Sequence, residues 1–283
     1  MQICYTKDEL RVALADLRRS GDIGLVPTMG HLHAGHMALV SKARSDTTHV
    51  VASIFVNPIQ FGSQEDLVNY PRTLEHDLDM LRAAGVALVF VPNTQTMFHE
   101  EAQTIIETTA LSTMLMGSLR PGHFKGVATI VMKLFNLFQP DRAYFGEKDY
   151  QQLAVIRTMV RDLDVPVDIV SVATVREPDG LAMSSRNSRL SKPSRAAAAI
   201  LFQACKMGET MAHEGATADE ISRQIFEVIS ENPLADVQSV DVRHADTLEE
   251  YEGIITAPAV ILLAVRFDPV LLIDQYVIKQ KQD

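Results

Sequence analysis

Two kinds of apolar pattern alternate along the first 175 residues. Apolar runs at residues 23–26, 49–56 and 86–91 have the length and composition of buried strands, and residues 142–145 and 167–175 are predicted to form two further strands. Between them, apolar residues at helical spacing predict helices over 37–44, 72–84, 127–138 and 150–163. An earlier helix follows a capping box at residues 6–9 and ends at Gly21. The repeated strand–helix–strand order predicts an α/β fold with a parallel sheet and helices on both faces.

The pattern changes after about residue 176. Two helices are predicted in succession, over 194–211 and 218–229, and then three strands, over 237–243, 259–267 and 270–278. Consecutive helices followed by consecutive strands are typical of a small α+β unit. A polar loop with Pro178 and Gly180 separates the two patterns. We therefore expect one domain over 1–176 and a second, smaller one over 177–283.

Length and charge narrow the class of protein. The chain has 283 residues, enough for about two domains, and 47% of them are apolar. A formal net charge of -10 argues against a broad basic surface for nucleic acid. The two cysteines, Cys4 and Cys205, cannot build a disulfide framework, and no apolar run reaches the ~20 residues that span a bilayer. Since no apolar signal segment is visible, we expect a cytoplasmic protein with no nucleic-acid or membrane partner.

The loop after the first predicted strand carries the strongest chemical signal. Residues 27–36 place two glycines and three histidines, His31, His33 and His36, between a strand and a helix start. The helix dipole and the N–H groups at that start favour an anion. Neither common Gly-rich phosphate signature is present, so a phosphate would contact His33, His36 and the helix start. Capping or surface histidines, or a zinc site, are the competing interpretations.

A second polar segment follows the next predicted strand. Asn57 and Gln60 offer neutral donors and acceptors at the end of a strand, which is where ligands bind in open α/β sheets. Such groups can orient a hydroxylated substrate without adding charge. An ordinary Asn-Pro turn explains the segment equally well when it is considered alone.

Two further segments supply cations and hydroxyls. Lys148 follows the strand at 142–145 and suits a phosphate, although a single loop lysine is usually solvated, and Asp149 fits a helix N-cap. The loop at 180–188 has the donors of a phosphate clamp, in Ser184, Ser185 and Arg186. A hinge loop with anion-binding groups is also what a closing lid would use.

Together these segments resemble one family, the pantothenate synthetases, which are pantoate–β-alanine ligases of the nucleotidyltransferase superfamily. Residues 27–36 are similar to the family's P-T-M-G-x-L-H-x-G-H, 55–61 to F-V-N-P-x-Q-F, and 145–152 to F-G-E-K-D-x-Q-Q. Other matching segments are residues 70–73, 120–127, 175–177 and 183–187. The matches run in order across about residues 25–190. His31 and Ala34 occupy the variable positions of the first motif, and no role for His31 follows.

The resemblance implies a Rossmann-like ATP- and pantoate-binding domain over 1–176, a C-terminal α+β lid over 177–283, and a homodimer. It also implies the reaction. The pantoate carboxylate attacks the α-phosphate of ATP, which gives pantoyl adenylate and pyrophosphate. The β-alanine amine then attacks the acyl carbon, which gives pantothenate and AMP. Mg²⁺ accompanies ATP.

The family's site residues carry over by motif. The catalytic groups would be His36, His33 and Lys148, while Gln60 and Gln152 would hold pantoate and Gln60 would also contact β-alanine. ATP would contact Met29, Gly30, His31, Leu32, His33, Ala34, Gly35, His36, Gly146, Glu147, Lys148, Asp149, Val175, Met183, Ser184, Ser185 and Arg186. Metal ligands stay unassigned. Asp77 is a candidate for a water-mediated Mg²⁺ contact, on a helix that could equally be a surface helix.

Three other functions stay open on the sequence alone. A different nucleotidyltransferase would make a nucleotide-containing product. An aminoacyl-tRNA-type activator would share the His-x-x-His helix start, but the acidic charge counts against it. A silent nucleotide-binding module could lose polar groups that this chain keeps.

Overall fold

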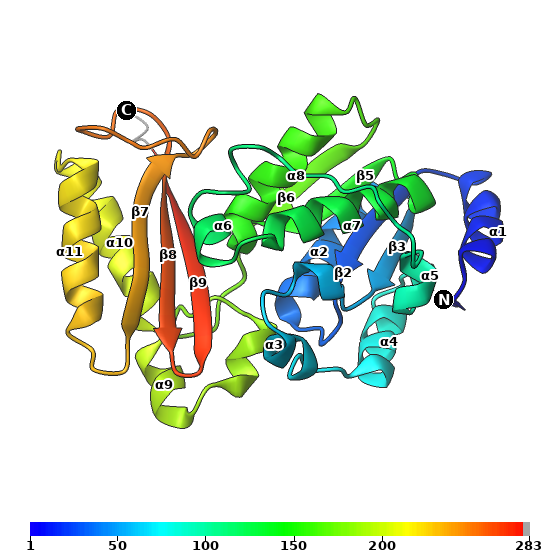
Figure 1. The fold of residues 1–283 in the computed structure, drawn as a ribbon, viewed down its shortest axis with the longest axis horizontal. Coiled ribbons are helices and arrows are strands. Elements are labelled where there is room, and N and C mark those ends of the chain that lie inside the picture. Colours follow the sequence, from blue (N-terminus) through cyan, green and yellow to red (C-terminus); the bar gives the residue numbers. More distant parts are fainter. Residues whose placement is uncertain (280–283) are drawn as a thin grey trace. The chain divides into compact units, whose positions relative to one another are not determined.

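The structure is a computed structural model in which residues 1–279 are described, and the chain divides into two compact units (Figure 1). The first comprises Met1–Gly146 and Val155–Ala173, and the second comprises Glu147–Ala154 and Thr174–Asp283. The compact units therefore differ from the expected domains in two ways: the division falls after Ala173, and residues 147–154 group with the second unit. The boundary at 176/177 stays a prediction about domains.

The first unit is built on a six-stranded parallel sheet, in the order β1-β4-β3-β2-β5-β6. Its strands are β1 (Gln2–Cys4), β2 (Ile23–Thr28), β3 (His49–Ile54), β4 (Leu88–Phe90), β5 (Arg142–Gly146) and β6 (Asp168–Val172). The predicted parallel sheet is confirmed. The three-residue β1 has no counterpart in the sequence prediction, because so short a strand leaves no period to detect.

Helices surround this sheet, and most begin within a few residues of the predicted positions. They are α1 (Lys7–Arg18), α2 (Ala34–Asp46), α3 (Gln64–Val68), α4 (Leu74–Ala83), α5 (Thr94–Met97), α6 (Met116–Leu119), α7 (His123–Phe138) and α8 (Tyr150–Asp162), with the 3₁₀ turn η1 (Pro58–Gln60). The 3₁₀ turn η2 (Glu147–Asp149) and the first residues of α8 group with the second unit. The capping box at the start of α1 is present, since Thr6 and Glu9 satisfy each other's backbone N–H groups.

The sheet buries both of its faces, as a parallel sheet requires. On one face, Leu39 and Val40 of α2 and Leu78 of α4 cluster with alternate residues of the central strands, such as Val26. On the other face, Phe138 of α7 meets Phe90 of β4 edge to face, with ring centroids 6.0 Å apart. The helices packed on the two faces of the sheet thus hold its strands in position.

The strand order reverses between β2 and β5. From β2 the chain passes to β3 and then β4 on one side, whereas β5 and β6 lie on the other side. β2 pairs with β3 along all of Ile23–Thr28, but with β5 through Gly24–Arg142 and Leu25–Ala143. A reversal of this kind opens a crevice at the carboxyl ends of the strands, where open α/β sheets bind ligands.

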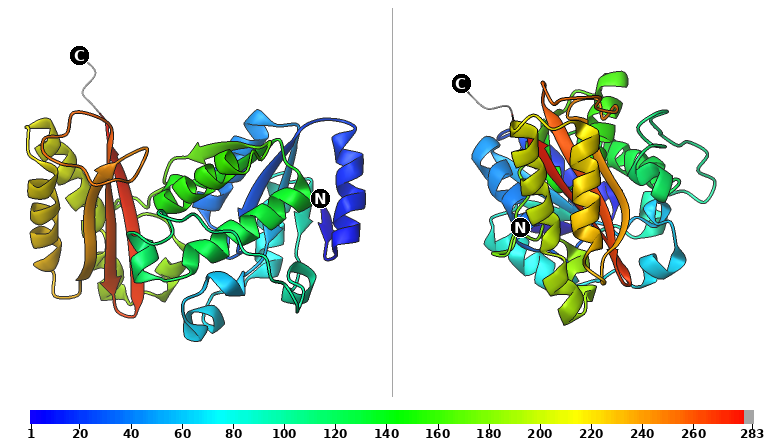
Figure 2. Two further views of the ribbon diagram at one scale, coloured as in Figure 1. Left: turned by 45° about the horizontal axis from the view of Figure 1, so that its top comes forward. Right: turned by 90° about the vertical axis from the view of Figure 1, so that its left-hand side faces the viewer.

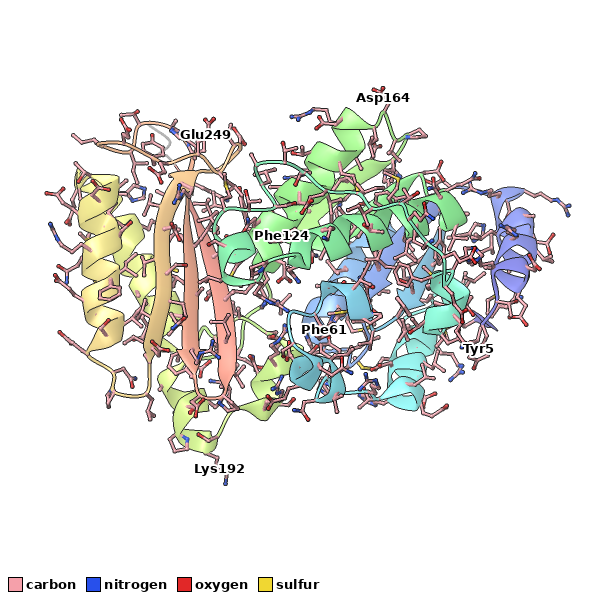
Figure 3. All side chains as sticks on the ribbon, viewed as in Figure 1. Tyr5, Phe61, Phe124, Asp164, Lys192 and Glu249 are labelled. Carbon is pink, nitrogen blue, oxygen red and sulfur yellow. The ribbon has the colours of Figure 1, made fainter. Side chains whose placement is uncertain are left out.

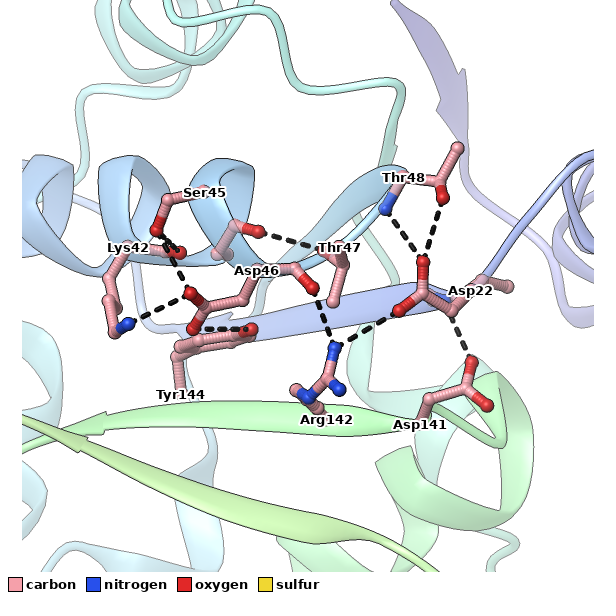
Figure 4. Close-up of polar contacts among 11 residues, drawn as sticks. Asp22, Lys42, Ser45, Asp46, Thr47, Thr48, Asp141, Arg142 and Tyr144 are labelled. Carbon is pink, nitrogen blue, oxygen red and sulfur yellow. Dashed lines mark hydrogen bonds and ion pairs between the residues drawn. The ribbon is translucent and has the colours of Figure 1, made fainter.

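A polar network closes the opposite, amino-terminal edge (Figure 4). Asp22 accepts hydrogen bonds from the N–H and the hydroxyl of Thr48, both at 2.8 Å, and these contacts hold its pKa below the usual value. Arg142 donates to Asp22 at 3.1 Å and to the carbonyl of Asp46 at 2.6 Å. Burial, with the nearby Asp46 carboxylate, raises the pKa of Tyr144 to about 12. This network therefore stabilises the edge of the sheet opposite the carboxyl strand ends, the edge at which open α/β sheets bind ligands.

The second unit has a three-stranded antiparallel sheet, in the order β7-β8-β9. Its elements are η3 (Ser185–Arg189), α9 (Lys192–Ala197), α10 (Ile200–His213), α11 (Ala218–Ser230), β7 (Asp236–His244), β8 (Ala259–Phe267) and β9 (Val270–Ile278). Both long helices pack on one face of the sheet (Figure 2), where Leu201, Ile225 and Ile261 are fully buried. The predicted α+β unit is confirmed, but the single helix expected over 194–211 is two helices, α9 and α10.

Candidate active site

The segments with chemical signals start at the carboxyl edge of four neighbouring strands. Residues 29–33 follow β2 and residues 55–61 follow β3. The chain leaves β5 at Gly146 and β6 at Val172 from the same edge. Because parallel strands end at one edge of a sheet, the sheet topology brings the starts of these four segments to the same edge.

His33 and His36 lie against each other at the start of α2, with ring centroids 4.1 Å apart. His33 is the N-cap residue, since its Nδ1 accepts the N–H of Gly35 at 3.1 Å, and Nδ1 of His36 accepts the N–H of His33 at 3.3 Å. A backbone N–H can only donate, so both Nδ1 atoms carry a lone pair and each neutral ring holds its proton on Nε2. Because both Nδ1 atoms accept backbone hydrogen bonds, both rings are Nε2–H donors at the N-terminus of α2.

The turn before these histidines has an unusual backbone. Gly30 has φ 82° and His31 has φ 52°, so two successive residues lie in the left-handed region. Asp77 of α4, 1% exposed, accepts the N–H of His31 at 2.8 Å and the N–H of Leu32 at 2.9 Å. A side-chain carboxylate far along the sequence thus holds the backbone that leads into His33.

A chain of amide contacts follows β3. Nδ2 of Asn57 donates to the carbonyl of Gly126 at 3.1 Å and to Oε1 of Gln60 at 2.9 Å. Because the Gly126 carbonyl can only accept, the orientation of the Asn57 amide is determined, and that of Gln60 follows from it. Nε2 of Gln60 then lies 3.1 Å from Sδ of Met29, a weak acceptor. Two predicted site residues, Met29 and Gln60, are brought together in this way.

Helix α7 supports the Gln60 segment. A Cβ added to Gly126 would lie 2.5 Å from the Ile59 carbonyl oxygen, so only glycine permits this approach of helix and turn. Nδ1 of His123 donates to the Gln60 carbonyl at 2.7 Å. Phe61 and Phe124, both labelled in Figure 3, flank these contacts in sequence, and Phe61 packs edge to face on Tyr70. The turn is therefore held by backbone contacts on both sides.

In the second unit, Lys148 lies in η2, directly after β5. Its side chain is 18% exposed, and its Nζ is 3.7 Å from Oδ1 of Asp149. An ion pair of that length is weak enough for a phosphate oxygen to compete with it. Next along the chain, the hydroxyl of Tyr150 donates to the Ala245 carbonyl at 2.9 Å, and Gln151 is buried while Gln152 is partly exposed.

Val175 and Met183 are neighbours across a hairpin, where the N–H of Met183 donates to the Val175 carbonyl at 2.9 Å. The hairpin is anchored by Arg176, whose guanidinium donates to both carboxylate oxygens of Asp274 at 2.7 and 2.9 Å. The same guanidinium stacks on the ring of Phe202, 4.2 Å from its centroid. This anchor holds the segment that leads to Ser184.

The hydroxyls and the arginine of the predicted phosphate clamp follow at the start of η3. Ser184 is its N-cap and accepts the N–H of Arg186 at 3.2 Å, while Ser185 is 9% exposed. Asn187 donates to the carbonyl of Ala182 at 3.0 Å and so ties the clamp to the hairpin. The residues of this segment form a continuous local structure rather than a linker.

The predicted residues fall into two local groups. The first unit holds residues 29–36 and Gln60, with Gly146 at its end, and the second holds residues 147–149, Gln152, Val175 and residues 183–186. Sequence reasoning did not assign the positioning contacts of Asn57, Asp77, His123 and Arg176. Each makes its contact with a residue distant in sequence or with a backbone carbonyl, which leaves no local pattern.

Metal binding by the chain itself has little support in its side chains. Among residues 1–279, no group of three or more His, Cys, Asp or Glu side chains is arranged to hold a metal ion. A zinc site would also need imidazole lone pairs, and Nδ1 of both His33 and His36 is engaged with a backbone N–H. In the same described part of the chain, no helix is both long and apolar enough to cross a membrane.

Comparison with known proteins gives a consistent result along the whole chain. The family model described as pantoate-beta-alanine ligase matches residues 2–277. The pantothenate synthetase of Sinorhizobium medicae is 50% identical over 283 residues, which cover 99% of this chain and 97% of that protein. The pantothenate synthetase of Chloroflexus aggregans is 48% identical over 98% of this chain and 100% of that protein.

Solved structures agree with the fold. The crystal structure of pantothenate synthetase from Thermus thermophilus matches with a TM-score of 0.94 and 46% identity, covering 99% of this chain and 100% of that one. Pantoate-beta-alanine ligase from Francisella tularensis, solved as a complex with beta-gamma ATP and beta-alanine, matches with a TM-score of 0.83 and 30% identity over 99% and 98% of the two chains.

Proposed function

The chain belongs to the pantoate-beta-alanine ligase family, and on this premise we propose that it condenses pantoate with β-alanine, using ATP, through a pantoyl adenylate. The observation that supports the chemistry most directly is the His33–His36 pair, which presents two Nε2–H donors at a helix N-terminus. Family membership also decides against the tRNA-type activator that the sequence left open, and the complete reaction described below tests the silent binding module.

In the first step, a carboxylate oxygen of pantoate attacks the α-phosphorus of ATP. The new P–O bond forms while the bond to the bridging oxygen of pyrophosphate breaks, so negative charge grows on the α-phosphate and on the leaving group. His33 and His36 would donate from Nε2 to these oxygens, helped by the positive end of the α2 dipole. Because each neutral ring donates from Nε2, its Nδ1 can keep its hydrogen bond to the backbone at the start of α2.

The second unit would supply the remaining contacts to ATP. Lys148 would neutralise phosphate charge, and Ser184, Ser185 and Arg186 would hold the triphosphate through hydroxyls and a planar guanidinium. Val175 and Met183, paired by their backbones, would flank the nucleoside. Gly146 lets the chain approach the ligand at the end of β5.

Pantoate would be held by amides. Gln60 presents Nε2 because its Oε1 accepts from Asn57, so it donates to the pantoate carboxylate or hydroxyls rather than repelling them. Gln152 would be the second amide. In the second step, the neutral amine of β-alanine attacks the acyl carbon, AMP leaves with the bonding electrons, and the amine loses a proton to solvent.

Magnesium would enter as part of the MgATP substrate. Mg²⁺ usually keeps several waters and is held through substrate phosphates with one or two carboxylates. The Asp77 carboxylate does not fit such a role, because both its oxygens accept hydrogen bonds from the protein. No protein ligand to the metal is therefore assigned, and no step is routed through it.

Three expectations from the resemblance stay predictions: a homodimer, a cytoplasmic location, and a lid function for the C-terminal unit. The homodimer can be tested by light scattering at enzyme concentrations used for assays. Solution scattering with and without ATP and pantoate tests whether the C-terminal unit closes.

The deciding experiment is a complete reaction. The protein is mixed with MgATP, D-pantoate and β-alanine, and AMP and pantothenate are quantified by mass. Without β-alanine, pantoyl adenylate should accumulate to about one equivalent per active site. If AMP forms without pantothenate, or a nucleotide-containing ester appears as the final product, the proposal is wrong.

A further inference from the structure

We propose that Asp77 is a positioning residue for adenylate formation: its buried carboxylate holds the Gly30–His31 turn, and the turn sets the place of His33 and His36. This inference rests on the roles proposed above for the two histidines. It assigns Asp77 to the protein backbone and not to a metal ion.

The contacts of Asp77 are numerous for one side chain. Oδ2 accepts the N–H of His31 at 2.8 Å, and Oδ1 accepts the N–H of Leu32 at 2.9 Å and the hydroxyl of Thr73 at 3.1 Å. Hydrogen bonds to an ionised carboxylate are about twice as strong as neutral ones. A side chain 1% exposed that accepts three of them is fixed in place and fixes its partners.

The turn needs such a partner. A non-glycine residue in the left-handed region, such as His31 at φ 52°, is strained and persists only where its surroundings determine it. The carboxylate also packs closely against Gly30, where an added Cβ would lie 2.9 Å from Oδ2. Asp77 therefore selects both the backbone conformation and the residue type of the turn.

Only Leu32 separates the anchored turn from His33, and Leu32 is itself 7% exposed. His33 is extended, with φ -142°, and caps α2. Rotation of the peptide groups at 31 and 32 would thus move the N-cap and, through its N–H, the ring of His36. Misplacing catalytic donors by about 1 Å can cost about 10²-fold in rate.

The test is Asp77→Asn, which keeps the shape but places an amide NH₂ against one of the two backbone N–H groups. Single-turnover formation of pantoyl adenylate, without β-alanine, separates the rate constant from the fraction of active molecules. We expect the rate constant to fall about 10- to 100-fold, with the amplitude, the KM for ATP and the Mg²⁺ midpoint changed less than about threefold. The matched control is Asp79→Asn, an exposed carboxylate two residues further along α4.

Two outcomes overturn the proposal. A wild-type rate constant with reduced amplitude would show that Asp77 acts on stability alone. A rate that recovers at high Mg²⁺ would show that Asp77 is a metal ligand. His36→Ala, measured in parallel, keeps the two proposals separate, since a wild-type rate in that variant contradicts the histidine roles instead.

A second, milder variant tests the same proposal in case Asp77→Asn does not fold. Thr73→Val removes the hydroxyl that donates to Asp77 and lies 3.3 Å from Nδ1 of His31, and it leaves the two backbone N–H donors to Asp77 unaltered. We expect its rate constant to fall at least about twofold at unchanged Mg²⁺ midpoint. An unchanged rate constant in Thr73→Val, together with an unfolded Asp77→Asn protein, also overturns the proposal.

Discussion

The side-chain amide of Asn57 donates to Oε1 of Gln60 at 2.9 Å, and this contact fixes the orientation of the Gln60 amide, so that its Nε2 points toward Met29. The Gly126 carbonyl holds Asn57 in the same orientation. In the proposed site, Asn57 thereby decides whether Gln60 offers a donor or an acceptor to the carboxylic acid substrate.

Asn57→Asp should reverse the orientation of the Gln60 side-chain amide. A carboxylate at position 57 would face two acceptor oxygens, so Gln60 would turn its Nε2 toward position 57 and its Oε1 toward the substrate. Mispairing a buried polar group costs about 1–3 kcal/mol, and we expect the KM for pantoate to rise about tenfold or more while the KM for ATP changes little. Steady-state kinetics with each substrate varied measures the difference.

Asn93→Asp is the matched control, because Asn93 caps α5 and aspartate caps equally well. An Asn57→Asp variant whose KM for ATP rises as much as that for pantoate would contradict the placement of Gln60.

His36→Ala and Lys148→Ala should each fold normally and lose adenylate formation by at least about 10²-fold, if each removes a preorganised donor to developing charge. Pantoate-dependent exchange of pyrophosphate into ATP is the measurement. His99→Ala and Lys192→Ala, at exposed positions, are the controls. A wild-type rate of pyrophosphate exchange in both test variants would contradict the roles assigned to His36 and Lys148.

The N–H of His31 donates to Asp77 at 2.8 Å, whereas Nδ1 of its ring makes a longer contact of 3.3 Å with Oγ1 of Thr73. We therefore expect His31→Asn to lose much less activity than His31→Val, because asparagine tolerates the left-handed region and a β-branched residue does not. The strain in the valine variant is about 1–3 kcal/mol and should also lower the melting temperature. If asparagine and valine reduce the rate equally, the imidazole of His31 is needed and this explanation fails.

The Arg176–Asp274 pair should govern the stability of the second unit. The carboxylate is 0% exposed, and removing one member of a buried pair typically costs about 3–5 kcal/mol. Asp274→Ala should therefore unfold at clearly lower urea concentration. The double variant Arg176→Met/Asp274→Leu should recover part of the loss, so a strictly additive pair of effects would show that the two side chains are not coupled.

Acid should weaken the amino-terminal edge of the sheet. The hydrogen bonds from Thr48, with the charge of Arg142, lower the pKa of Asp22 in the folded protein. A lowered folded pKa adds stability above the unfolded value, about 4, and this stability disappears as the pH falls through the folded value. The melting temperature of Asp22→Asn should thus lie below that of the wild type at pH 7, with the gap closing below about pH 4. A gap that widens in acid would reverse the sign of this linkage.

The periodic parts of the fold could be predicted from the sequence because strands and helices repeat a local pattern. Strands β8 and β9 have the predicted bounds, and β2 starts at the predicted Ile23. The predicted helix over 194–211 is instead broken after Ala197, at alanines, which have the highest helix propensity. Nothing local marks that break.

The positioning contacts are of another kind. Asp77 lies on a helix whose pattern is compatible with a surface helix, yet its partners are 45 and 46 residues earlier in the chain. The sequence alone predicts that Asn57 is part of a turn. Its hydrogen bond to the Gly126 carbonyl joins residues 69 positions apart and depends on the folded chain. Motifs predict the groups proposed to contact substrate, whereas tertiary contacts in the structure identify the residues that position those groups.

The ladder between β2 and β5 is short and consists of the pairs Gly24–Arg142 and Leu25–Ala143. Beyond Leu25, β2 continues to Thr28 alongside β3, while its register with β5 ends at Leu25–Ala143. Strand register therefore sets where the chain turns away from the sheet on the two sides of β2. Substitutions in the loops after β2 and β5 can then change which side chains are presented at this edge, while the positions of the strand ends stay set by the pairing of the six strands.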